Sequence, residues 1–95
     1  MRRTNTSADC VFEQLGFEKS QAANLRVRAA MMDAVIAEVE KRGLAQAQAA
    51  KLMGITQPRV SDLMRGKLHL FSIDTLVTLL AGLGMRVEFK VRKAA

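Results

Sequence analysis

The spacing of apolar residues predicts a chain built mostly from helices. Residues 20–42 contain neither glycine nor proline, and their apolar positions recur at intervals of three and four. Such spacing draws one stripe along a helix that packs against a core. The stripe consists of Leu25, Ala29, Met32, Ile36 and Val39. Met31 and Val35 are expected to lie beside it and widen it, and Glu38 and Arg42 are expected to form an i, i+4 ion pair on the outside.

Two short helices are predicted around Gly54. From Ala45 to Met53 the residues are good helix formers, and Gly54 ends that run. Thr56 is a suitable N-cap for the next helix, and Pro58 falls in the first turn, where its missing N–H is tolerated. The second helix runs up to Gly66. Its buried face is predicted to consist of Val60, Leu63 and Met64.

A last helix is predicted over residues 72–82, with Ser72 as its N-cap and Asp74 near its positive dipole end. Gly82 and Gly84 are expected to stop this helix. The residues predicted on its buried side are Ile73, Leu76, Leu79 and Leu80.

The pattern changes to strict alternation over residues 85–91, which predicts a half-buried strand. No other segment is a convincing strand, so its backbone groups need a partner elsewhere. Pairing with the same strand of a second copy would give a two-fold dimer; the alternatives are the sheet edge of another protein, or an unpaired strand on its own domain. The first is the preferred interpretation. The dimerisation residues are then Met85, Val87, Phe89 and Val91.

The N-terminal region divides into two parts. Residues 1–10 are polar and predicted to be a disordered tail, and residues 11–95 to be one domain. Residues 11–17 form a short apolar segment ended by Gly16, which predicts one helical turn that docks Phe12, Leu15 and Phe17 on the core.

Composition narrows the function classes. The 95 residues carry a net charge of +6, which suits a polyanionic partner, although charge alone is a weak signal. The single cysteine, Cys10, fits a reducing cytoplasm and excludes a disulfide framework. No secretory signal or membrane-spanning apolar run is recognised. His69 has no partners that would make it a metal ligand, no cofactor is implied, and nothing resembles the residue clusters of an enzyme.

The segment 44–66 resembles, without a gap, the helix-turn-helix of the Xre/Cro/phage-repressor family. Departures from the family pattern are Ala45 for a capping threonine, Ala49 for a common leucine, and Pro58 inside the second helix. The resemblance implies a mainly α, lambda-repressor-like bundle of four to five helices, to which the strand would be added. The matching residues are Leu44, Gln46, Ala50, Met53, Gly54, Ile55, Thr56, Val60, Ser61 and Gly66.

In such a motif the second helix enters the major groove and the first crosses the DNA backbone. Gln57 and Arg59 are the best candidates for reading bases, since glutamine pairs bidentately with adenine and arginine with guanine. Asp62 fits two roles, accepting from cytosine or orienting Arg59 or Arg65. The expected base contacts are Gln57, Pro58, Arg59, Ser61 and Asp62. The expected backbone contacts are Gln46, Lys51, Thr56, Arg65 and Lys67, although solvated lysines are nearly as common as lysines that touch phosphate.

The flanking segments resemble those of HigA-type antitoxins over about residues 11–91. The resemblance implies a partner, a RelE/HigB-like toxin that cleaves mRNA, and repression of a shared operon. The basic charge gives no support for that pairing, because such toxins are commonly basic too. The sequence therefore predicts a dimeric repressor that binds a pseudo-palindromic operator, and the favoured interpretation is that this repressor is an antitoxin. The alternative is a stand-alone or phage-derived Xre-family regulator without a toxin.

Overall fold

The long helix extends further toward the N-terminus than the sequence predicts. The structure, a computed structural model, describes the backbone of residues 9–94 and the side chains of residues 18–94. Helix α1 (Asp9–Lys41) is continuous over 33 residues. The expected helix end at Gly16 is therefore wrong, since one glycine inside a helix costs only about 1 kcal/mol. The docking of Phe12, Leu15 and Phe17, and the tail up to residue 8, lie outside what is described; Asp9 and Cys10 belong to α1.

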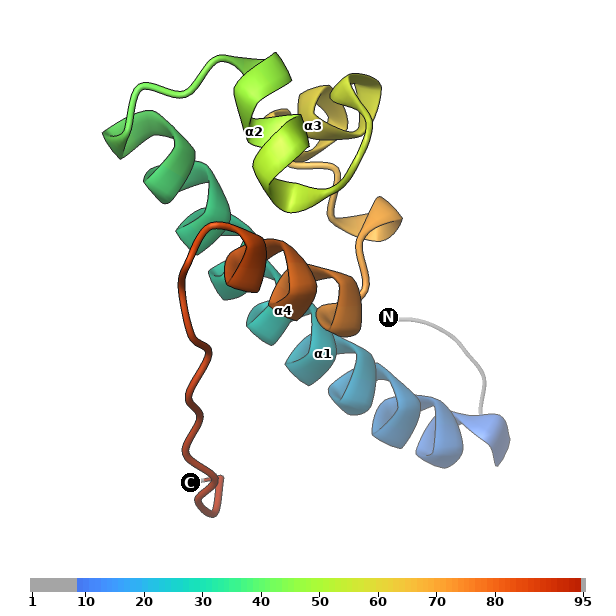
Figure 1. Ribbon diagram of the computed structural model, residues 1–95. Helices are drawn as coiled ribbons and strands as arrows, with labels where there is room; N and C mark the ends of the chain where they lie inside the picture. The colour runs from blue at the N-terminus through green and yellow to red at the C-terminus, as the bar shows by residue number, and fades with distance from the viewer. Residues whose placement is uncertain (1–8, 95) are drawn as a thin grey trace.

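The other helices cover the C-terminal half of α1. They are α2 (Gln46–Met53), α3 (Gln57–Met64), a 3-10 turn η1 (Leu68–Leu70) and α4 (Ile73–Gly82). Figure 1 shows α4 lying along the middle of α1, α2 and α3 stacked at one end, and the N-terminal half of α1 reaching past the bundle. This is the mainly helical architecture that the sequence predicts.

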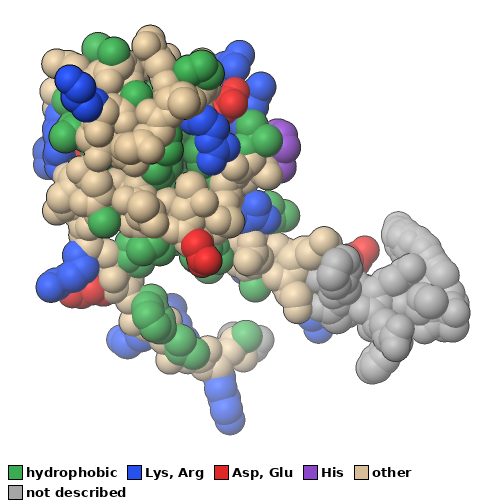
Figure 2. Space-filling model, turned by 45° about the vertical axis from the view of Figure 1, so that its right-hand side comes forward, with side chains coloured by type: hydrophobic (Ala, Val, Ile, Leu, Met, Phe, Trp, Pro, Cys, Tyr) green, Lys and Arg blue, Asp and Glu red, His purple; other side chains and the backbone are tan. Residues whose placement is uncertain are grey.

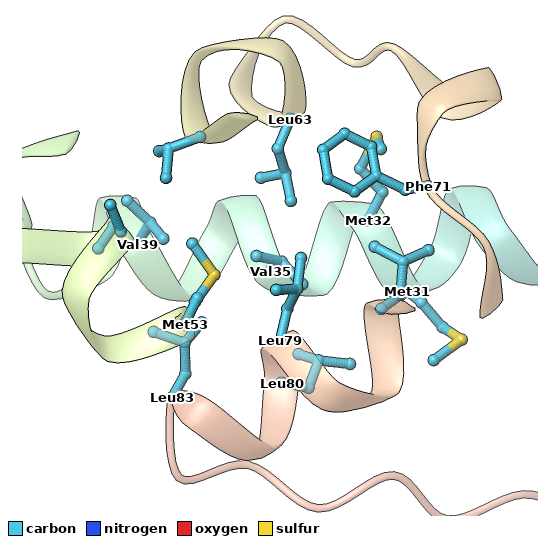
Figure 3. Close-up of a cluster of buried hydrophobic side chains, with 14 residues drawn as sticks. Met31, Met32, Val35, Val39, Met53, Leu63, Phe71, Leu79, Leu80 and Leu83 are labelled. Atoms are coloured by element: carbon cyan, nitrogen blue, oxygen red, sulfur yellow. The ribbon is translucent and has the colours of Figure 1, made fainter. Parts of the chain in front are cut away.

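The buried face of α1 is rotated from the predicted stripe. Val35, expected beside the stripe, is completely buried, whereas Leu25, expected in it, is 43% exposed. The difference arises because α1 contacts α4, α3 and η1, which together cover a wider face than a single stripe. In Figure 3, Val35, Leu63 and Leu79 point into the common core from three helices.

Two arginines of α1 tie the later segments to it. Arg42 pairs with Glu38 at 2.6 Å, as predicted, and also donates from Nη2 to the carbonyl of Leu83. Arg28 donates from Nη1 to the carbonyl of Leu68 at 3.1 Å. The Leu83 carbonyl lies at the C-terminal end of α4, where carbonyls lack partners within the helix, and the Leu68 carbonyl belongs to the first residue of η1. The end of α4 and the start of η1 are thereby fixed relative to α1.

Gly82 lies where α4 meets α2 most closely. A Cβ at this position would stand 2.5 Å from the carbonyl oxygen of Leu52 and 3.1 Å from the Cα of Met53. Both atoms are backbone and cannot move aside without shifting α2. The predicted helix stop is confirmed, since α4 ends at Gly82, and the same glycine also allows the two helices to touch.

Gly82→Ala is expected to lower the free energy of unfolding by about 1–3 kcal/mol, because overpacking at this contact forces α2 and α4 apart. Denaturant unfolding followed by circular dichroism measures the change. The control, Val77→Ala on the exposed side of α4, should stay within about 0.5 kcal/mol of the parent. Equal stability of Gly82→Ala and the parent would mean that this close contact is not required.

The predicted strand at residues 85–91 is not present within the part of the chain that is described. After Gly84 the backbone runs on without regular structure, and Figure 1 shows it leaving the bundle. Val87 packs against the core, while Phe89 and Val91 are 87% and 83% exposed. The alternation indicates one side facing the body, but a strand also needs the backbone of a second strand. Residues 9–94 supply none, so the strand expectation is wrong for the single chain.

Candidate nucleic-acid interface

The turn between α2 and α3 has the geometry that the sequence predicts. Gly54 takes a left-handed conformation with φ 70°, which glycine adopts without a steric penalty. The N–H of Ile55 donates to the carbonyl of Ala50 at 3.1 Å, and Ile55 packs against the core. The hydroxyl of Thr56 then caps α3 by accepting from the N–H of Arg59. The predicted N-cap and the Pro58 position in the first turn are confirmed.

The start of α2 is capped in a way that sequence reasoning missed. Ala45 has no side chain with which to cap, but the N–H of Ala45 donates to the side-chain oxygen of Gln48 at 2.9 Å. A glutamine three residues into a helix is half of a capping box, and this signal was present in the sequence. Gln48 therefore supplies the reciprocal half of the capping box, and the half that a threonine side chain would form is absent.

The two helices turn their architectural residues inward. Ala49 and Ala50 of α2 and Val60 and Leu63 of α3 are buried, and Met64 is half-buried. Small alanines allow α3 to cross α2 closely. The remaining residues of α3 reach the surface to different extents: Gln57 and Pro58 are exposed, and Arg59, Ser61 and Asp62 are half-buried. All five predicted base-contact residues therefore lie on α3 and have accessible surface.

Arg59 is held in a fixed position by the segment that follows α3. Its Nη1 donates to the carbonyl of Leu70 at 2.9 Å, and its guanidinium carbon lies 4.2 Å from the centre of the Phe71 ring. Stacking of this kind restricts the side chain without using its hydrogen-bonding edge. No hydrogen bond from its Nε or Nη2 to another described residue is found, so that edge can still donate to a guanine. Sequence reasoning did not identify Phe71 as the residue that positions Arg59.

Asp62 is paired with two cations of the same surface. Its Oδ1 lies 3.1 Å from Nη2 of Arg65 and 3.6 Å from Nζ of Lys67. Of the two roles predicted for Asp62, the structure shows the second: Asp62 pairs with Arg65 and orients its side chain. All three side chains are partly exposed, so the pairs contribute little to stability and the cations remain accessible to phosphate.

The predicted backbone contacts all reach the surface. Gln46, Lys51, Thr56 and Arg65 are exposed and Lys67 is half-buried. Residues 44–67 contain four basic side chains and one acidic side chain, a local charge of +3. Figure 2 shows Lys and Arg side chains on the upper part of the molecule, some of them beside the purple His69 of η1.

The described residues contain no group of three or more histidine, cysteine, aspartate or glutamate side chains that could hold a metal ion. Among the helices that were described, none has the length and apolar character needed to cross a membrane.

Comparison with known proteins agrees with this geometry. A family model described as a helix-turn-helix domain matches residues 11–92. The chain belongs to this helix-turn-helix family. A solved structure described as an XRE-family transcriptional regulator is similar to this helix-turn-helix protein with a TM-score of 0.72 and 38% identity, over 78% of this chain and 83% of that one. Among curated proteins, none matches the chain. These matches confirm the Xre-type helix-turn-helix and do not concern an antitoxin.

Proposed function

We propose that this helix-turn-helix protein is a dimeric, sequence-specific DNA-binding repressor. The observation that carries the proposal is the α2–turn–α3 unit, in which Gly54 ends α2, Thr56 caps α3, and Gln57 is exposed at the N-terminal end of α3. That end of a recognition helix meets base edges in the major groove.

The bases would be read by Gln57 and Arg59. Gln57 is exposed at the first position of α3 and pairs bidentately with adenine. Arg59, held by Leu70 and Phe71, donates from its remaining edge to guanine O6 and N7. Pro58, Ser61 and Asp62 complete the predicted base contacts and provide shape and polar contacts beside these two.

The phosphates would be bound by side chains around the ends of α2 and α3. The hydroxyl of Thr56 accepts from the backbone of α3, but its O–H is still a donor for phosphate oxygen. Gln46 begins α2 and Lys51 lies in its last turn, with Arg65 and Lys67 following α3. Each cation that touches phosphate releases counterions, so binding falls as the salt concentration rises.

A dimer would place two α3 helices about 34 Å apart, one turn of DNA, on a pseudo-palindromic operator. The C-terminal residues Met85, Val87, Phe89 and Val91 are the proposed dimerisation residues. The exposure of Phe89 and Val91 supports this role, because burying two large apolar side chains against a second copy is favourable.

The finer proposal is that the repressor is the antitoxin of a type II toxin–antitoxin module and that it regulates its own operon. Its support is the resemblance of residues 11–91 to HigA-type antitoxins. Co-expression with the adjacent gene distinguishes this role from that of a stand-alone regulator: a RelE/HigB-like product that co-purifies supports the antitoxin, and a neighbour that does not bind supports the alternative.

A gel-shift titration on the DNA upstream of the protein's own gene tests the proposed function. We expect a preference of about a thousandfold or more over random DNA of equal length at physiological salt. Arg59→Ala should lose about 1–3 kcal/mol on the specific site and relax selectivity there. Lys51→Ala should instead weaken binding to all DNA sequences alike and reduce the slope of log affinity against log salt concentration by about one.

Arg59→Lys is the matched control, because it keeps the charge but not the planar fork that recognises guanine. It should retain the salt slope and lose selectivity. Weak binding of the parent to both DNAs, abolished by salt, would show that charge alone acts and would overturn the proposal.

A further inference from the structure

A groove lies between α1, α4 and the C-terminal segment. Its volume is about 230 Å³. The lining comes from all three segments and is mostly apolar: Ala30, Met31, Ala34, Leu80, Met85 and Val87. The charged residues Arg86 and Glu88 of the C-terminal segment also line it. An apolar cavity of roughly 150 Å³ holds a benzene ring, so this groove has room for one phenyl side chain.

The C-terminal segment beside this groove carries large apolar side chains that are exposed to solvent. Val87 packs against the core, and residues 89 and 91 share its side of an extended chain because side chains alternate. Phe89 and Val91 are nevertheless 87% and 83% exposed. Figure 2 shows the segment after α4 standing off the body, with hydrophobic side chains open to solvent. A groove and a free phenyl ring are thus adjacent in one chain, but the ring does not occupy the groove.

We propose that the groove is filled by Phe89 of a second copy. In this dimer residues 85–91 of the two copies pair antiparallel about a two-fold axis at Val87, so that Met85 of one lies opposite Phe89 of the other. Directly opposite side chains in an antiparallel pair lie about 4.5–5.5 Å apart at Cβ and on the same face. Phe89 of each copy is thereby brought to the Met85 side of its partner's groove.

The face of the segment restricts the possible registers. Odd-numbered residues must lie opposite odd-numbered residues, because Val87 of both copies turns toward a core and a shift by one residue would reverse one strand. The two-fold axis must therefore pass through a residue position, and the neighbouring choices are positions 86, 87, 88 and 89.

Charge then selects position 87. Arg86 and Glu88 lie on the same side of the segment, 2.9 Å apart, and both are largely exposed. An axis at Val87 places Arg86 of each copy opposite Glu88 of the other, which gives two attractive pairs, and places Lys90 opposite Gly84. An axis at 86 or 88 places like charges opposite themselves, and an axis at 89 places Arg86 opposite Arg92. Like charges directly opposite destabilise a strand pair, so among these four positions only 87 avoids repulsion.

This inference rests on the proposed dimeric repressor and specifies how its two copies meet. Its tests are made without DNA, by sedimentation equilibrium of the full chain. If the sedimentation results contradict the proposed register while the parent still binds its operator, only this inference is overturned. If the parent shows no specific binding in the gel-shift, the proposed repressor function is overturned.

Charge reversal tests the register. Arg86→Glu, or Glu88→Arg, should raise the dimer Kd at least about tenfold, because two attractive pairs become repulsive. The double variant Arg86→Glu, Glu88→Arg should return the Kd to within about threefold of the parent. Lys90→Glu is the control: it faces Gly84 in the proposed register and should leave the Kd unchanged, whereas with an axis at 89 it would weaken the dimer. A monomeric parent, an unaffected single reversal or a double variant that is not restored would each overturn the inference.

Disulfide formation tests the position of the axis independently. In a Cys10→Ser background, Val87→Cys places two thiols opposite each other within the Cα distance that a disulfide spans, about 4.4–6.8 Å. Oxidation should therefore link most of the Val87→Cys protein as a dimer. Phe89→Cys, whose counterpart is four residues away along the ribbon, should remain mostly unlinked. The opposite order of the two yields would overturn the register.

Discussion

Phe71→Ala is expected to lower the free energy of unfolding by about 3–5 kcal/mol, the largest loss of stability foreseen for a single substitution in this chain. Phe71 is 1% exposed and is the largest of the fully buried side chains. Figure 3 shows its ring within the buried cluster. Its removal would leave a cavity in the buried core cluster. Since small domains are stable by about 5–15 kcal/mol, the variant should be close to unfolding.

Phe71 also supports Arg59, and a second variant separates the two effects. Phe71→Leu keeps an apolar side chain in the core but removes the ring over which Arg59 stacks. We expect a smaller loss of stability than in Phe71→Ala, together with a measurable loss of operator selectivity. Denaturant unfolding and gel-shift titration give the two quantities. Unchanged selectivity in a folded Phe71→Leu would show that Arg59 does not need the ring for its position.

Deletion of residues 85–95 is expected to lower operator affinity by about a hundredfold to ten-thousandfold. The reason is avidity, because two linked helix-turn-helix units bind two half-sites as one event and separated units do not. Gel-shift titration measures the affinity, and sedimentation measures the loss of the dimer. The deletion also removes Val87 from the core, so circular dichroism must show that the remaining chain is folded.

A shorter deletion serves as the control for this truncation. Removing residues 92–95 leaves the whole of the proposed pairing segment. The operator affinity should stay within about threefold of the parent when the two proteins are compared at a high salt concentration, where the lost charges of Arg92 and Lys93 contribute little. Parent-like operator affinity in the longer deletion would contradict a role for residues 85–91 in dimerisation.

The α2–turn–α3 unit could be predicted almost completely from the sequence because its signals are local. Gly54, Thr56 and Pro58 each act on the backbone of their own turn, and the structure places all three as expected. The ion pair between Glu38 and Arg42 is local in the same sense.

Two misses were local, the helix that continues past Gly16 and the Gln48 cap, and the other errors concern contacts between segments that are distant in sequence. Arg59 is fixed by Leu70 and Phe71, more than ten residues away, and no periodicity indicates such a contact. The buried face of α1 depends on where α3 and α4 cross it, which made Val35 central and left Leu25 exposed. For residues 85–91 the alternation correctly indicated an inward Val87, but a strand depends on a partner that the single chain does not contain.

The close contact at Gly82 has a consequence for the evolution of DNA targets. Since α4 touches α2 through Gly82 and its end is bonded to Arg42, the C-terminal segment leaves the body from a point that is rigid relative to α3. In the proposed dimer, the few residues between Leu83 and Val87 would act as a ruler for half-site separation. Two residues inserted in each arm would move the bodies apart by up to about 13 Å. That is roughly four base pairs of DNA, so short insertions here would retune operator spacing while leaving base recognition untouched.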